Sequence, residues 1–230
     1  MCGIMGCIGT NRNATAVILD GLSKLEYRGY DSAGICTLQD NGLCIQKKKG
    51  RLADLTESIG ELPVSSIGIG HTRWATHGVP SDNNAHPHSD CSGRIAVVHN
   101  GIIENYAGLR KDLILEGHDF VSETDTEVVV HLLEHYYNGS LEEAVRKTLA
   151  DLQGSFALAI MCQDEPDKLV AVKKDSPLII GLGEGENYVA SDIPAILGRT
   201  SQVYIMEDNE LAVVTSGEVK ITDLEGRPIN

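Results

Sequence analysis

From Gly154 onward the chain alternates short apolar runs with brief polar turns, and this pattern restricts the fold more than any other feature. Most successive runs are separated by fewer residues than a parallel connection requires, which is a dozen or more. The pattern therefore predicts mainly antiparallel sheet. The expected strands span residues 156–161, 169–172, 178–182, 188–191, 211–214 and 219–221.

The first half of the chain adds strands and helices to this sheet. Residues 3–9 read as a buried strand, and the apolar residues Ile18, Leu22 and Leu25 follow at helical spacing. A hairpin is expected around the Asn41-Gly42 turn. Further short strands are expected at 67–71 and 95–99, and residues 72–93 between them read as a long structured loop.

Three helices are predicted between residues 106 and 152. Tyr106, Leu109 and Leu113 mark the first, and the third begins at Ser140 with Glu143 at the fourth position of a capping box. The second is expected to begin near Thr124 or Asp125, where two overlapping capping boxes, 122–125 and 124–127, occur. Helices segregated against antiparallel sheets predict one α+β layered domain over residues 1–230.

The charge and the termini exclude several classes of function. The formal net charge is −14, from 19 basic and 33 acidic residues, so nucleic acid and anionic membranes are unfavourable partners. A solvated acidic surface is the preferred interpretation. No apolar run reaches the roughly 18 residues of a membrane span, and no basic residue precedes the first apolar stretch, so a cytoplasmic location is expected. Six scattered cysteines then predict buried thiols for five of them, with Cys2 as the exception.

Cys2 is a candidate nucleophile because of its position. Removal of Met1 leaves a thiol and a free α-amine on one residue, with ordinary pKa values of about 8.5 and 7.7–8.0. The amine can then accept the thiol proton near neutral pH, which is the N-terminal form of an activated nucleophile. Glycines at positions 3 and 6 keep the first strand accessible to a substrate.

The remaining chemistry needs oxyanion donors and charged groups that bind an amino acid. The Asn100 amide and the Gly101 N–H follow a run of valines and are candidate oxyanion donors, although an Asn-Gly pair equally suits a type I′ turn. Arg73 follows a strand and can bind a carboxylate through two parallel hydrogen bonds. Asp125 can bind an ammonium group, although a carboxylate near a helix start needs no ligand.

Several long motifs in one order carry a family resemblance. They are CGIMG at 2–6, LEYRGYDSAG at 25–34, HTRWATHG at 71–78, NAHPH at 84–88, VHNGIIEN at 98–105 and VSETDTE at 121–127. Together they resemble the glutaminase domain of the glutamine–fructose-6-phosphate aminotransferase family, class II glutamine amidotransferases of the N-terminal-nucleophile hydrolase type. The resemblance extends over essentially the whole chain.

The resemblance implies a four-layer αββα sandwich that hydrolyses the side-chain amide of glutamine. It implies Cys2 as nucleophile, Asn100 and Gly101 as oxyanion donors, and Arg73 and Asp125 as the groups that hold the carboxylate and ammonium of L-glutamine. The loop that closes over glutamine would contain Trp74, Thr76 and His77, and Arg28 matches a motif arginine near the nucleophile.

The same resemblance sets expectations about partners. It implies a C-terminal sugar-phosphate synthase part that this chain lacks. No cofactor and no metal site are expected. A second copy of the chain in a homodimer is left open.

Three other functions compete with this interpretation. A metal protein would use His86 and His88 with Asp90 and Cys91, or the pair His131 and His135, but no second cluster at recognisable spacing completes a closed site. The two helical histidines are expected on a solvated face. A regulatory module would bind glutamine without using Cys2. A glutaminase could also serve another acceptor, in phosphoribosylamine or asparagine synthesis.

Overall fold

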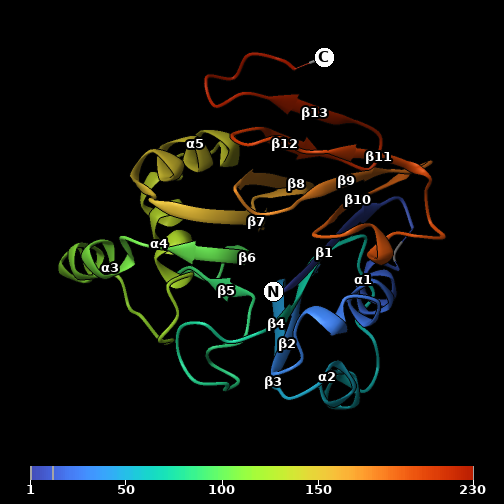
Figure 1. Cartoon of the computed structure of the whole chain (residues 1–230), viewed down its shortest axis with the longest axis horizontal. Helices are drawn as coiled ribbons and strands as arrows, with labels where there is room; N and C mark the ends of the chain where they lie inside the picture. The colour runs from blue at the N-terminus through green and yellow to red at the C-terminus, as the bar shows by residue number, and fades with distance from the viewer. Residues whose placement is uncertain (1, 12, 230) are drawn as a thin grey trace.

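The computed structural model describes residues 2–11 and 13–229, and within them thirteen strands form two antiparallel sheets (Figure 1). The strands of the seven-stranded sheet, in spatial order, are β11 (Gln202–Ile205), β9 (Ile179–Leu182), β10 (Glu186–Ala190), β1 (Gly3–Gly9), β4 (Ile67–Arg73), β2 (Ser32–Gln39) and β3 (Gly42–Lys49). Those of the six-stranded sheet are β13 (Val219–Thr222), β12 (Leu211–Val214), β8 (Glu165–Lys174), β7 (Gly154–Cys162), β6 (Ile95–Ile103) and β5 (His88–Ser89).

Two groups of helices cover the outer faces of the sheets. Helices α1 (Ala14–Ser23) and α2 (Leu52–Ile59) lie on the seven-stranded sheet. Helices α3 (Tyr106–Leu115), α4 (Glu127–Tyr136) and α5 (Leu141–Asp151) lie on the six-stranded one. The order helix, sheet, sheet, helix is the four-layer sandwich implied by the resemblance, so that expectation is confirmed.

Three apolar clusters separate the four layers. One lies between α1, α2 and the first sheet, and another lies between α3, α4, α5 and the second sheet. The third fills the space between the sheets and is rich in small residues, including Ala96, Ala157, Ala159 and Ala171. Small side chains on facing strands allow the two sheets to pack closely.

The strand predictions are largely correct. Residues 3–9 form β1 over the expected range, and each expected strand after Gly154 is present. The strands 67–71 and 95–99 continue further, to Arg73 and Ile103. Asn100 and Gly101 therefore lie inside β6, paired with Ala157 and Phe156 of β7, and the interpretation of this dipeptide as a hairpin turn is wrong.

The helix predictions need one correction. Helix α5 begins as expected, with the Ser140 hydroxyl accepting the Glu143 N–H. Helix α4 begins later, at Glu127, and Thr126 caps it without a side-chain hydrogen bond. Neither expected capping box forms, because the Glu127 carboxylate instead accepts the Val121 and Ser122 N–H groups and the Ser122 hydroxyl. Helix α2 and strand β11 were not predicted.

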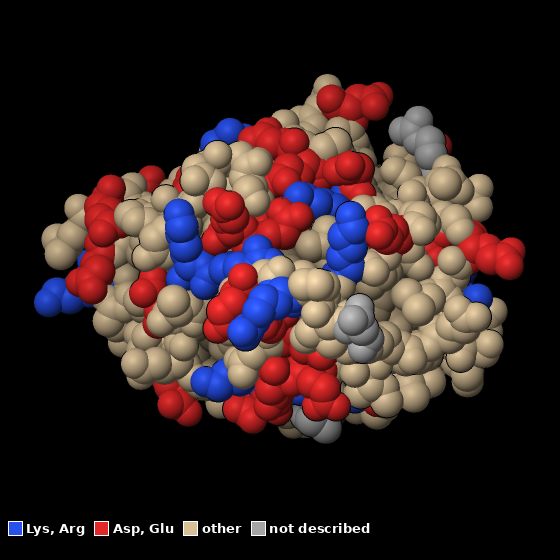
Figure 2. Space-filling view, turned by 90° about the horizontal axis from the view of Figure 1, so that it is seen from above, with Lys and Arg blue, Asp and Glu red and all other residues tan. Residues whose placement is uncertain are grey.

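Charged side chains of both signs share the molecular surface. Figure 2 shows the face above β13, where acidic and basic side chains are interspersed. On this part of the chain Lys220 pairs with Glu218, and Arg227 pairs with Asp223 and Glu225. Among the described residues, no helix is both long and apolar enough to cross a membrane.

Two glycine substitutions test the packing of helices on the sheets. A Cβ at Gly70 on β4 would lie 2.5 Å from Ile18 Cγ2 of α1 and 2.9 Å from Leu22 Cδ1. Gly70→Ala should therefore destabilise the fold by about 1–3 kcal/mol, because the well-packed layer must shift. Gly108 lies in α3 and has no atom within 4 Å of an added Cβ. Gly108→Ala should instead stabilise by about 0.5–1 kcal/mol through helix propensity.

Urea unfolding followed by circular dichroism measures both changes. Equal stabilities for the two variants would contradict the described packing of α1 on β4.

Candidate active site

A pocket of about 280 Å³ opens where the ends of β1, β4 and β6 meet the segment before α4. It collects most of the residues that the sequence predicted for the site. Those that line it are Cys2, Arg73, Trp74, Thr76, Asn100, Gly101 and Asp125. Antiparallel pairing sets the start of β1 beside the end of β4, and the packing of the two sheets brings β6 against them. Residues from positions 2 to 125 thus converge on one cavity.

The backbone and side chain of Cys2 are both held at the pocket wall. Its carbonyl oxygen accepts hydrogen bonds from Asn100 Nδ2 at 3.0 Å and Arg28 Nε at 3.2 Å. Arg28 is fixed in turn by an ion pair with Asp192 at 2.6 Å. The Cys2 Sγ accepts the Trp74 N–H at 3.2 Å. Burial raises the pKa of the Cys2 thiol, and the Trp74 N–H only partly opposes this rise. The resting thiol is therefore protonated at neutral pH and needs a base.

The base proposed from the sequence is the Cys2 α-amine after removal of Met1, and Met1 lies outside the described residues. The Cys2 Sγ and carbonyl oxygen are nevertheless held by hydrogen bonds from residues within the described part of the chain. The Cys2 sulfur is thus placed at the pocket by contacts that do not involve the α-amine.

His71 determines the orientation of the Asn100 amide, and the sequence did not predict this role. His71 Nε2 lies 3.0 Å from the His99 carbonyl oxygen and 3.0 Å from Asn100 Oδ1. A carbonyl oxygen only accepts, so His71 Nε2 carries the proton and the facing Asn100 atom is the oxygen. The Asn100 NH₂ group consequently points toward Cys2, with one N–H on the Cys2 carbonyl and a second N–H still to donate.

Gly101 occupies a backbone conformation that a larger residue would disturb. Its φ is +130°, and a Cβ would lie 2.1 Å from the Ser155 carbonyl oxygen. On either side along the same strand, the His99 N–H donates to His86 Nδ1 and the Ile103 N–H donates to Asp125. Gly101 lies between these two residues and lines the pocket, so its N–H is a candidate donor there.

Arg73 ends β4 and presents a cation to the pocket. Its Nη2 donates to the carbonyl oxygens of His77 and Gly78, which fixes the guanidinium plane. Its Nη1 is buried without a hydrogen-bond partner anywhere in residues 2–11 and 13–229. A buried, unsatisfied charged donor is costly, so the geometry favours an anionic ligand at this position.

Asp125 lies in the segment before α4, not within the helix as the sequence suggested. Its Oδ2 accepts the Ile103 N–H at 2.8 Å, and its Oδ1 lies 3.8 Å from His77 Nδ1. His77 packs its ring against Tyr106 beside the pocket but does not line it. Trp74 is half exposed and contacts Tyr30 edge-on, whereas Thr76 lines the pocket.

Four buried histidines support the floor of the pocket, and sequence reasoning missed two of them. His71 and His86 stack with ring centroids 4.2 Å apart, and His86 lies against His88 and His99. Burial lowers the pKa of His71 to about 3 and also lowers the pKa values of His86, His88 and His99. The rings are therefore neutral and act as hydrogen-bonding supports.

The metal arrangements considered from the sequence do not form as written. His86 and His88 contact the hydroxyls of Thr126 and Thr124, and neither belongs to a group of three or more potential metal ligands among the described residues. His131 is fully buried, so its expected place on a solvated face is wrong, whereas His135 is exposed. The prediction of five buried thiols is wrong for two of them, since Cys91 is exposed and Cys44 is only half-buried.

Comparison with known proteins adds to this geometry. A family model for the glutamine amidotransferase domain matches residues 71–198. Over its full length the chain is 56% identical to the isomerizing glutamine–fructose-6-phosphate aminotransferase of Caldanaerobacter subterraneus subsp. tengcongensis. It is 53% identical to the enzyme of the same name from Thermus thermophilus. The chain spans 38% of the length of each of these relatives.

Solved structures show the same fold. The glutamine phosphoribosylpyrophosphate amidotransferase of B. subtilis superposes with a TM-score of 0.84 at 26% identity, covering 97% of this chain and 49% of that one. An allosteric regulatory enzyme of purine biosynthesis gives a TM-score of 0.86 at 27% identity, with the same coverage. The fold, the pocket and the sequence relationships agree, and the chain belongs to the family of glutamine amidotransferase domains.

Proposed function

We propose that this domain hydrolyses the side-chain amide of L-glutamine through a thioester on Cys2. The observation that carries the proposal is the convergence of four groups on one pocket. These are the Cys2 thiol, the Asn100–Gly101 donors, the unpaired Arg73 nitrogen and the Asp125 carboxylate. This combination supplies a nucleophile, oxyanion donors and both charges needed to bind an α-amino acid.

In the first step the Cys2 sulfur attacks the carbon of the glutamine carboxamide. The thiol proton passes to the α-amine of Cys2, directly or through one water, since that amine is the base on the same residue. The carbonyl oxygen becomes an oxyanion in the tetrahedral intermediate. In this proposal the remaining Asn100 N–H and the Gly101 N–H stabilise it, and one such donor is worth about 10²–10³ in kcat.

Collapse of the intermediate breaks the carbon–nitrogen bond. The ammonium formed on the α-amine returns its proton to the leaving nitrogen, which departs as ammonia. The carbonyl carbon remains bound to Cys2 as a thioester. Water then attacks the thioester with the same base and the same oxyanion donors, and glutamate is released. The route uses no cofactor.

Recognition of glutamine follows from the two charged groups. Arg73 Nη1 is free to pair with the α-carboxylate. Asp125 Oδ2 accepts the Ile103 N–H, and Oδ1, which lies 3.8 Å from His77 Nδ1, would accept from the α-ammonium. Trp74, Thr76 and His77 belong to the loop beside the ligand, where closure would exclude water. Arg28 holds the Cys2 backbone and does not need to contact glutamine.

The acceptor of the ammonia is proposed from the relatives. Two relatives that share more than half of their aligned residues with this chain are named as acting on fructose 6-phosphate, whereas the phosphoribosylpyrophosphate amidotransferase shares 26%. We therefore propose that, in a protein that also contains a synthase part, this domain supplies ammonia for glucosamine 6-phosphate formation. The phosphoribosylamine alternative is not favoured, and a binding module without turnover would leave the positioned thiol unused.

Changes at and before Cys2 test the nucleophile and its base. Cys2→Ala should still bind glutamine, because Arg73 and Asp125 remain, but it should release no ammonia above background. A chain with an uncleavable extension before Cys2 keeps the thiol and loses the basic amine, so its turnover should also fall to near background. Ammonia release and glutamine binding by calorimetry measure the two quantities. In the processed protein, kcat/KM should fall as the pH drops below the amine pKa of about 7.7–8.0.

Cys44→Ala is the matched control, since Cys44 is a half-buried free thiol far from the lining of the pocket. It should keep full activity. Full turnover by the extended protein would eliminate the α-amine as base, and full turnover by Cys2→Ala would eliminate the proposed function at this pocket.

Substitutions at Arg73 and Asp125 test recognition of the two charged ends of glutamine. Arg73→Lys and Asp125→Asn should each lower kcat/KM roughly 30-fold to several-thousand-fold, because one buried charge-assisted contact is lost. This decrease corresponds to about 2–5 kcal/mol of lost transition-state binding. Asparagine retains an oxygen for the Ile103 N–H, so the fold should persist. Steady-state kinetics with glutamine, at equal thermal stability, measure the effect.

Arg94→Lys and Asp164→Asn repeat the same chemical changes in an exposed ion pair remote from the pocket. These variants should be indistinguishable from the unmodified chain. If Arg73→Lys or Asp125→Asn behaves like its control, that residue does not bind glutamine.

A further inference from the structure

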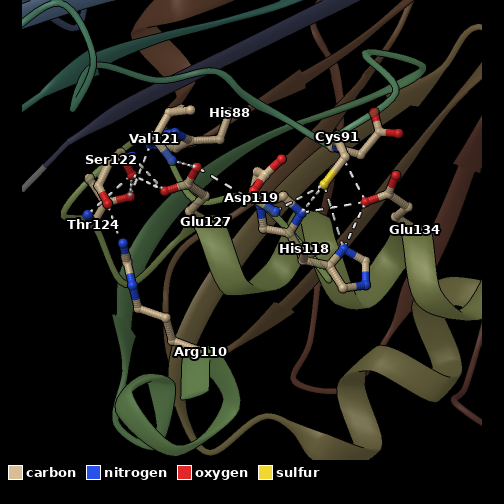
Figure 3. Close-up of polar contacts among 12 residues, drawn as sticks. His88, Cys91, Arg110, His118, Asp119, Val121, Ser122, Thr124, Glu127 and Glu134 are labelled. Atoms are coloured by element: carbon tan, nitrogen blue, oxygen red, sulfur yellow. Dashed lines mark hydrogen bonds and ion pairs between the residues drawn. The ribbon is translucent and has the colours of Figure 1, made fainter. Parts of the chain in front are cut away.

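We propose that Cys91, His118, His131 and Glu134 form a structural zinc site outside the pocket. Cys91 lies in the turn between β5 and β6, His118 follows α3, and the other two lie on α4. One potential ligand atom from each residue lies within 4.8 Å of the others. Figure 3 shows Cys91, His118 and Glu134 directed toward one another at α4. None of the four lines the pocket around Cys2.

The distances between the ligand atoms fit a tetrahedral ion. Bonds of about 2.0–2.3 Å at tetrahedral angles separate the ligands of zinc by about 3.3–3.6 Å. Cys91 Sγ lies 3.7 Å from His118 Nδ1 and 3.6 Å from His131 Nδ1. Glu134 Oε2 lies 3.4 Å from His131 Nδ1 and 2.9 Å from His118 Nδ1. The 2.9 Å separation is shorter than two zinc ligands require, so binding would move His118 Nδ1 and Glu134 Oε2 apart.

The surrounding groups suit metal-bound ligands. The Asp119 N–H donates to Cys91 Sγ at 3.4 Å, an orientation that stabilises a thiolate. His131 Nδ1 faces the cluster, while its Nε2 is buried 3.8 Å from Glu127 Oε1. Histidine ligands characteristically direct their second nitrogen to a carboxylate, which orients the ring and raises its basicity. Glu127 is itself held by Ser122 and Val121, so this outer partner is fixed.

The donor set identifies the class of metal. One thiolate, two imidazoles and one carboxylate are the ligand types of a tetrahedral zinc ion, and four protein ligands leave no open position for catalysis. The two negative ligands balance the charge of Zn²⁺, which makes the complex neutral where the cluster is partly buried. A structural role follows from the closed coordination.

The sequence alone did not indicate this zinc site. The four residues occur at positions 91, 118, 131 and 134, so only the last pair has recognisable local spacing. The fold supplies the missing ligands by placing the Cys91 turn and the segment after α3 on the same face of α4. His135, the expected partner of His131, instead lies near Glu116 and His118.

The site would fasten residues 116–126 to α4. That segment includes Thr124, Asp125 and Thr126, which line the pocket. Zinc bound only to the folded chain raises its stability. With free Zn²⁺ a thousandfold above Kd, Tm should rise by about 8–16 °C. Turnover below the Tm of the metal-free protein should be unchanged by exhaustive dialysis against a chelator.

Titration of the chelator-treated chain with Co²⁺, followed by Zn²⁺, tests the proposal. We expect one Co²⁺ per chain, visible bands typical of a tetrahedral ion, a sulfur-to-cobalt charge-transfer band, and displacement by one Zn²⁺. Cys91→Ser should lose the charge-transfer band, and His131→Ala should weaken binding at least tenfold. His135→Ala is the matched control, one helical turn away, and should bind like the unmodified chain.

A measurement without substitutions guards against variants that fail to fold. Zn²⁺ should slow alkylation of Cys91 at least tenfold, as mapped by peptide mass spectrometry, while alkylation of Cys44 stays constant. Absence of saturable one-to-one binding overturns the site. Binding that survives Cys91→Ser but is lost in His135→Ala overturns it in favour of the exposed Glu116–His118–His135 group. Loss of turnover on chelation below the metal-free Tm overturns the structural role.

Discussion

A polar connection between the two sheets determines the geometry of the site. His71 on β4 donates to Asn100 on β6, and the amide of Asn100 in turn holds the carbonyl of Cys2 ahead of β1. Alanine and other apolar side chains fill the space between the sheets, which lets the facing strands approach one another closely. Because His71 is buried and neutral, the direction of its proton is fixed by the His99 carbonyl, and the orientation of the Asn100 amide follows.

The segment that precedes α4 links the pocket with the rest of the second sheet. Asp125 secures the edge of β6 through the Ile103 N–H, and Thr124 and Thr126 contact the buried histidines. Glu127, the first residue of α4, gathers the N–H groups of Val121 and Ser122. Residues 121–127 are therefore ordered from both ends, which positions a carboxylate at a cavity without help from a ligand.

The sequence predicted the layers better than it predicted the contacts within the site. The antiparallel strands and α5 were identified because periodicity, turn length and a Ser140 cap are local signals. Chemistry and position alone suggested Cys2, Arg73 and Asp125, together with the Asn100–Gly101 pair, whereas Trp74 and Thr76 came from the family motifs. The role of His71 could not be predicted, since it depends on which strand faces which across the sandwich.

Other misjudged residues have physical explanations of the same kind. Asn100-Gly101 suits a turn by composition, but pairing with β7 keeps the dipeptide extended, and the Ser155 carbonyl occupies the space that a Cβ at Gly101 would need. The overlapping capping boxes before α4 were misleading because Glu127 turned toward the preceding segment instead. His131 was assigned to solvent, yet the chain after α3 covers it with Phe120 and His118.

The buried imidazoles also couple the fold to acidity. Burial depresses the pKa of His71 from its ordinary value of 6.5 to about 3, and His86, His88 and His99 shift in the same direction. At a pH between these limits the folded His71 ring stays neutral, while the same ring in an unfolded chain is protonated. The other three rings shift the balance in the same direction. Unfolding therefore takes up protons. The contribution of these histidines to the free energy of unfolding is fully present above about pH 6.5 and is lost as the pH falls below it. Several imidazoles that titrate together would make this acid transition steep.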